Sequence, residues 1–309
     1  MLLYVLLRGL DATALKWLQL SGAAHAVDGE NPISFCNVFF VAQAIVGLSA
    51  LLTGRGGLRR HLGALDGKDR RLLALHGGLG MFLGPIAAYL ALGSLAVISQ
   101  TLLFALVLPV SALLARWLLR EALPRGFWIS LSLILAGLLL PQAASAMGGG
   151  PMDELIGVGW ALVGVVAFAG SAITGRVVAG CGWPPAISVG LPSTLAALVF
   201  ALIALVLYGP HHFLLLRLWW VVGVIIVYGL ALSLGRELAL RAAYRRLPVA
   251  TVSLWGSLSI LVAAGSAAVV LGERGTWPTM LGLLLVLIGV CRYGASGNDE
   301  SQSDRPLGR

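Results

Sequence analysis

The stretch "LLREALPRGFWISLSLILAGLLL" (residues 118–140) contains a charged helix end, a short Pro-containing turn and an apolar run, in that order. A second stretch, "LGERGTWPTMLGLLLVLIG" (271–289), repeats this order. Glu121 and Glu273 occupy equivalent places, and each is followed sixteen residues later by a glycine, Gly137 or Gly289. Such internal repetition predicts that the chain consists of two related halves.

The composition around these stretches is that of an integral membrane protein. Hydrophobic residues make up 59% of the chain and charged residues 11%, and the mean hydropathy is +0.93, whereas a soluble domain carries roughly 25% charged residues. Several apolar runs reach the ~20 residues that a helix needs to cross a bilayer. They lack the polar–apolar alternation of a membrane β-barrel. We therefore predict an all-α, polytopic membrane protein with ten transmembrane helices, over residues 2–21, 33–53, 72–92, 95–117, 126–146, 155–175, 186–208, 216–243, 248–271 and 277–293.

The first of these spans contains three charged residues, Arg8, Asp11 and Lys16. A cleaved signal peptide is the alternative interpretation. We favour a retained helix, because its loss would leave the two halves unequal.

The basic residues define the orientation of the spans. Most of the 21 Lys and Arg residues fall in alternate loops and in the tail, and positive loops stay on the cytoplasmic side. Both termini are then cytoplasmic, in the inner (plasma) membrane. An odd number of spans in each half makes the halves inverted repeats, which we place at 1–147 and 148–294, followed by a disordered cytoplasmic tail at 295–309. The net charge of +8 is explained by this topology and by anionic lipid, so we expect no nucleic-acid partner.

The two quoted stretches and the segment "GLDATALK" (9–16) resemble the EamA-type carriers of the drug/metabolite transporter superfamily. The resemblance covers nearly the whole chain. It implies ten helices, inward-facing termini and the export or exchange of small metabolites or drugs.

Polar side chains inside the apolar spans are the candidates for function, because each must find a partner in hydrocarbon. Hydroxyl, amide and aromatic groups near matching depths of the fourth and ninth spans could line a cavity, and helix packing is the alternative role for them. The cavity candidates are Asp11, Asn37, Gln43, Ser99, Gln100, Thr101, Tyr228, Ser253, Trp255 and Ser257. For Asp11, the alternative is an internal ion pair with Arg8, three residues earlier.

Two ionisable residues are candidates for proton coupling. Burial of Glu237 would favour its protonated form, although Arg241, one turn onward, could simply neutralise it. His76 titrates near neutral pH in water, and the alternative is a neutral His76 bonded to a neighbouring helix. Arg236 either extends to the inner head groups or holds an anionic substrate. Glu121 and Glu273 are interpreted as structural residues that bond the turn after each helix end.

The sequence thus predicts a secondary carrier of small amphipathic metabolites or drug-like solutes, working by alternating access, with export coupled to protons as one option. Its expected partners are the small-molecule substrate and the lipid bilayer, with protons as an optional coupling ion, and the sequence leaves homodimer formation open. No HExxH, CxxC, GxSxG or Walker motif occurs, so we expect no enzyme activity, no metal and no cofactor. The alternatives are an intramembrane enzyme acting on lipid-linked substrates and a non-transporting scaffold or sensor.

Overall fold

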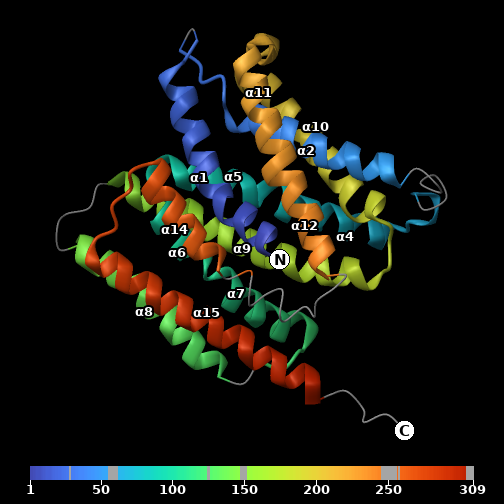
Figure 1. Cartoon of the computed structure of the whole chain (residues 1–309). Helices are drawn as coiled ribbons and strands as arrows, with labels where there is room; N and C mark the ends of the chain where they lie inside the picture. Colours follow the sequence, from blue (N-terminus) through green and yellow to red (C-terminus); the bar gives the residue numbers. More distant parts are fainter. Residues whose placement is uncertain are drawn as a thin grey trace. The chain divides into compact units, whose positions relative to one another are not determined.

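The computed structural model describes residues 1–27, 29–54, 62–123, 126–146, 152–244, 256 and 258–303. Within these ranges the named elements are all helical, which confirms the predicted all-α class (Figure 1). The first half contains α1 (Leu2–Ala24), α2 (Phe35–Thr53), α4 (Gly67–Gly77), η1 (Gly78–Leu83), α5 (Gly84–Ser94), α6 (Val97–Phe104), α7 (Val107–Leu114), η2 (Ala115–Leu119) and α8 (Phe127–Ala146). The second contains α9 (Met152–Gly180), η3 (Ala186–Gly190), α10 (Leu191–Tyr208), η4 (Pro210–Arg217), α11 (Trp219–Val227), η5 (Tyr228–Leu234), α12 (Gly235–Tyr244), α14 (Ser259–Val270) and α15 (Trp277–Ser303).

Helical segments overlap every predicted span. Among the described residues, six continuous helices are long and apolar enough to cross a membrane: 35–53, 67–94, 97–119, 154–180, 186–208 and 219–240. Shorter apolar helices cover 127–141, 259–270 and 277–292. Helix α1 is 23 residues long, but it carries the three charged residues noted above. These helices identify a multi-pass membrane protein.

Several long helices contain one turn of π-helix, at η1, η2, η3 and η5. A π turn breaks the regular ladder of backbone hydrogen bonds and leaves a carbonyl in need of a donor. In η1 the carbonyl of Met81 accepts a hydrogen bond from Gln43 Nε2 of α2 at 3.2 Å. Gln43, a predicted cavity residue, therefore supports a π turn.

The chain forms two compact units, and neither is one continuous segment. Unit 1 comprises Met1–Thr13, Leu90–Val165 and Arg236–Arg309. Unit 2 comprises Ala14–Tyr89 and Val166–Gly235. Each unit therefore contains helices from both halves of the sequence.

In unit 1, α8 packs against α15, and α6 packs against α14. Glycines allow the close approach of α8 and α15, because a Cβ at Gly137 would meet the Gly282 carbonyl oxygen at 2.5 Å. Gly289, the repeat equivalent of Gly137, faces Ile134 of α8 in the same interface. In both stretches, the glycine sixteen residues after the Glu thus serves helix contact.

In unit 2, α2 packs against α10, and α4 also contacts α10. The rings of Phe39 and Phe82 lie 5.4 and 5.2 Å from that of Phe200, so three aromatic side chains pack together between α2, η1 and α10. Gly77 of α4 lies directly against Pro192 of α10. This contact brings the beginning of α10 close to α4.

Glu273 stabilises the beginning of α6. Its carboxylate accepts hydrogen bonds from the backbone N–H groups of Val97 at 2.8 Å and Ile98 at 3.2 Å. The residue at the N-cap of α6, Ala96, offers no side-chain acceptor, so Glu273 satisfies two N–H groups that the helix itself cannot. Glu273 is thus a structural helix-end residue. We had predicted that it bonds the turn that follows it, but its partner is the beginning of another helix, α6.

We expect Glu273→Ala to lower the free energy of unfolding by about 1–2 kcal/mol, the usual cost of losing a helix cap. The carboxylate also interacts favourably with the positive end of the α6 dipole. Thermal unfolding in detergent and amide hydrogen exchange at Val97 and Ile98 measure the effect. The control is Glu154→Ala, which removes an exposed carboxylate from the first turns of α9. Equal losses in the two variants would contradict the capping role.

At the C-terminus, α15 continues as far as Ser303, past the expected end of the last span and into the segment predicted to be disordered. Extending an existing helix costs less free energy than nucleating a new one, so the apolar span carries helical structure into polar sequence. The rest of the predicted tail, 304–309, lies outside the described residues.

Candidate functional site

An ion pair in unit 1 joins α1 to α12. Arg236 Nη1 donates to Asp11 Oδ2 at 2.6 Å, and the two side chains are 40% and 26% exposed, respectively. Arg8 instead donates to the Tyr4 hydroxyl at 2.6 Å and lies 5.9 Å from the centre of that ring. The alternative of an internal Asp11–Arg8 pair is therefore wrong. Arg8 turns back one helical turn to Tyr4, and Asp11 pairs with α12.

The same part of α1 is fixed against α14. Thr13 Oγ1 lies 2.7 Å from Ser266 Oγ, and Gly9 lies against the Ser259 carbonyl and the Val262 side chain. Without a Cβ at residue 9 the two backbones can approach closely, as is common between membrane helices. These contacts of α1 with α14 position the carboxylate of Asp11.

Glu237 follows Arg236 on α12 and is half-buried. The side chain of Arg241, its expected neutralising partner, is outside what the structure describes.

On α6, Gln100 is only 3% exposed, and Ser99 and Thr101 are half-buried beside it. Ser253, Trp255 and Ser257 lie outside the described residues.

Unit 2 contains an apolar pocket between α1 and the α11–η5 segment. Its volume is about 350 Å³, and its lining residues are Ala14, Trp17, Leu18, Gly223, Val224, Val227, Tyr228, Ala231 and Leu232. Tyr228, a predicted cavity residue, contributes a ring and the only hydroxyl among the lining side chains. The pocket could hold a small apolar or aromatic group.

His76 contacts a neighbouring helix of unit 2. Its Nδ1 lies 3.2 Å from Thr174 Oγ1 and 3.5 Å from Ser171 Oγ, both on α9. This is the alternative expected for His76, a bond to an adjacent helix.

Asn37, also in unit 2, is fully buried and donates to the Pro32 carbonyl at 3.1 Å. That contact fixes the loop before α2.

A polar cluster in unit 2 was not anticipated. The two carboxylate oxygens of Glu30 lie 3.0 Å from His211 Nε2 and 2.7 Å from His212 Nδ1. His212 is fully buried, stacks on Tyr208 at 4.2 Å and places Nε2 2.8 Å from Ser34 Oγ. The cluster therefore connects the loop between α1 and α2 with the end of α10. Glu30 lies 181 residues before His211, and no spacing in the sequence links the two.

Acid should weaken this cluster. Hydrogen bonds from His212 and His211 hold the pKa of Glu30 below its ordinary value of 4.5. A carboxylate with a depressed pKa stabilises the fold at pH values above its unfolded pKa, and this contribution disappears as the pH falls through the folded pKa. We expect the melting temperature of Glu30→Gln to be lower than that of the wild type at neutral pH, with the difference vanishing well below pH 4.5.

The measurement is thermal unfolding over a pH series, with the exposed carboxylate variant Glu154→Gln as the control. That control should track the wild type at every pH. A gap between Glu30→Gln and the wild type that stays constant into strong acid would contradict the assignment.

Comparison with known proteins gives two similarities. Residues 155–293 match the model of the EamA-like transporter family. Over 282 residues the chain is 28% identical to an uncharacterized transporter of Synechocystis sp., and the match covers 87% of this chain and 78% of that relative.

Proposed function

We propose that the chain, whose residues 155–293 match the EamA-like transporter family, is a secondary carrier for small amphipathic metabolites or drug-like solutes. The family and the transporter-named relative support a membrane transporter and point away from catalysis. The proposal includes transport by alternating access, this class of solute and the coupling of transport to protons.

The observation that carries the proposal is the Asp11–Arg236 ion pair. It joins a helix from the first half of the sequence to one from the second half. Charged residues in membrane helices are costly and usually mark a functional pathway, and an ion pair of this kind adds little stability compared with apolar packing. A contact that can open and close between the halves is what alternating access requires.

The packing of the helices supports two inverted repeats at 1–147 and 148–294. In the predicted order of ten spans, the second packs on the seventh as α2 on α10, the fourth on the ninth as α6 on α14, and the fifth on the tenth as α8 on α15. A two-fold axis between the halves would bring such equivalent helices together. Asp11 and Arg236 also lie at similar distances, about 12–14 Å, from Leu2 of α1 and Tyr244 of α12 at the α-helical rise. This agreement supports inner-side placement of both helix ends.

The pocket beside Tyr228 supports an amphipathic solute. Pockets for small molecules commonly measure about 300–1,000 Å³ and combine apolar walls with few polar groups. The pocket has this character, with Tyr228 as its polar group. Glu237 and His76 remain the candidates for proton coupling.

The test is uptake of a panel of labelled metabolites into proteoliposomes that contain the full-length protein, with and without a pH gradient. We expect at least one amphipathic solute to move faster than into empty liposomes. Tyr228→Ala should slow this uptake, whereas Trp277→Ala, which removes a 74% exposed aromatic side chain, should not. Folded protein that moves no solute in the panel would refute the carrier, and a Glu237→Gln variant that still concentrates solute under a proton gradient would refute coupling through Glu237.

A further inference from the structure

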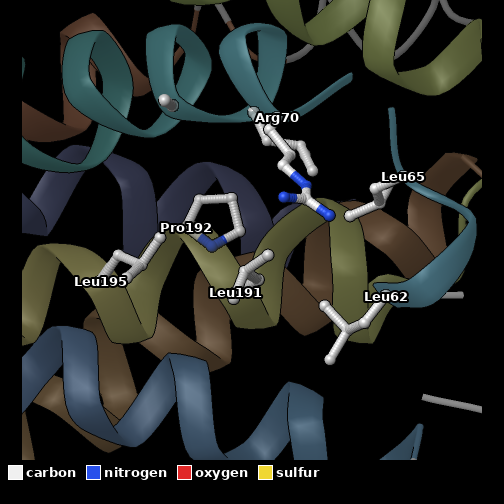
Figure 2. A pocket seen from close by; sticks show the side chains of 8 residues that line it. Leu62, Leu65, Arg70, Leu191, Pro192 and Leu195 are labelled. Carbon is white, nitrogen blue, oxygen red and sulfur yellow. The ribbon is translucent and has the colours of Figure 1, made fainter. Parts of the chain in front are cut away.

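A second pocket of unit 2 combines an apolar floor with one cation. It has a volume of about 410 Å³ and is lined by Leu62, Leu65, Arg70, Leu73, Ala74, Leu191, Pro192 and Leu195. Seven of these residues are apolar. Figure 2 shows the Arg70 side chain extending from α4 toward Leu65 and the α10 residues. No ion pair joins Arg70 to another residue within the described ranges.

The pocket lies where a polar helix end leads into an apolar span, which is the pattern expected near a membrane–water interface. Arg70 lies in the first turn of α4, and Leu191 begins α10. Lys68 and Arg71 lie within two residues of Arg70, and all three are exposed. Asp69, between Lys68 and Arg70, accepts a hydrogen bond from the backbone N–H of Asp66. The beginning of α4 is polar, whereas its continuation through α5 is apolar, so a cation here would lie at head-group level.

The apolar floor is built into the fold and is also accessible. Leu65 and Leu73 are 6% and 3% exposed and belong to a core cluster with Ile187. Leu195, one turn after Leu191 on α10, is 49% exposed. The contact between Gly77 and Pro192 holds α4 and α10 together beneath the pocket. The pocket is therefore open to the surroundings at Leu195, where an acyl chain of a lipid could enter it.

We propose that this pocket binds an anionic phospholipid of the leaflet that faces the basic loops. The Arg70 guanidinium would hold the phosphate through paired hydrogen bonds, and an acyl chain would lie on the Leu191–Leu195 side of α10. Basic pockets between membrane helices recognise such head groups. Free inorganic phosphate would gain nothing from the apolar floor, so the occupant must carry both charge and chain. This site does not depend on the proposed transport activity.

Native mass spectrometry of the purified full-length protein, after exposure to mixed phosphatidylcholine and phosphatidylglycerol vesicles, tests the proposal. We expect phosphatidylglycerol to be retained preferentially, and Arg70→Gln to reduce its retention about tenfold, because a hydrogen bond to a charged phosphate is lost. Arg71→Gln is the matched control, because it removes the neighbouring exposed arginine, which does not line the pocket. It should change retention less than twofold.

A second variant tests the apolar part independently of Arg70. Leu195→Trp places a bulky side chain in the pocket while leaving the charge intact, and it should also lower phosphatidylglycerol retention. Inorganic phosphate should not displace the lipid. Equal losses in Arg70→Gln and Arg71→Gln, full retention in Leu195→Trp, displacement by inorganic phosphate, or no preference for phosphatidylglycerol in the wild type would each overturn the proposal.

Discussion

Asp11→Asn should abolish solute uptake in proteoliposomes and destabilise the protein. The substitution leaves the Arg236 guanidinium without the carboxylate that now lies 2.6 Å away. Removing one partner of a buried pair costs about 3–5 kcal/mol, and exposed pairs are worth ~1 kcal/mol or less. Because both side chains are partly exposed, we expect a loss of about 1–3 kcal/mol in the free energy of unfolding.

The double variant Asp11→Asn with Arg236→Gln separates stability from transport. The second substitution removes the guanidinium that has lost the Asp11 carboxylate, so the double variant should unfold at a higher temperature than Asp11→Asn alone. It should still fail to transport, because the contact between the halves is absent. Glu154→Gln, which neutralises an exposed carboxylate at the beginning of α9, should retain full uptake. Normal uptake by the double variant would show that the pair is only structural.

Gly137→Ala should also have a large effect, through the interface of α8 and α15. The new methyl group would collide with the backbone carbonyl of Gly282 and with Val286. Backbone cannot rotate away as a flexible side chain can, so the two helices must separate. We expect destabilisation in the upper part of the ~1–3 kcal/mol range known for overpacked cores, measured by thermal unfolding in detergent.

Gly159→Ala is the matched control for this substitution. Gly159 lies in α9, and a Cβ there would meet no heavy atom within 4 Å. Replacing a helical glycine in open space removes the conformational cost of glycine and should stabilise the helix by up to about 1 kcal/mol. If both variants lowered stability equally, the close approach of α8 and α15 would not be the cause.

The helical spans could be predicted because hydropathy is a local property. Residues 127–146 lack charge whatever surrounds them, and the structure has helix α8 there. The glycines at 137 and 289 were also informative, because the repeat marked both and both lie in one interface. Composition, periodicity and repetition thus determine the elements and part of their packing.

The partners of the charged residues could not be predicted, since they are distant in sequence. Spacing along a helix suggested Arg8 for Asp11, but the actual partner is 225 residues away. Glu273 likewise caps a helix that begins 176 residues earlier. Arg70 is one of the basic residues that orient the spans, and no sequence pattern reveals that it lines an apolar pocket.

The π turn at η1 is a place where the span from α4 to α5 can shift its helical register by one residue. If this π turn tightened into ordinary α-helix, the register of the span would shift by one residue. The residues on one side of the turn would then rotate about the helix axis by about 100° and move along it by about 1.5 Å. That single step would swing Arg70 away from Leu191 and withdraw His76 from Thr174 together. Gln43 opposes this shift, because its amide donates a hydrogen bond to the Met81 carbonyl within the turn.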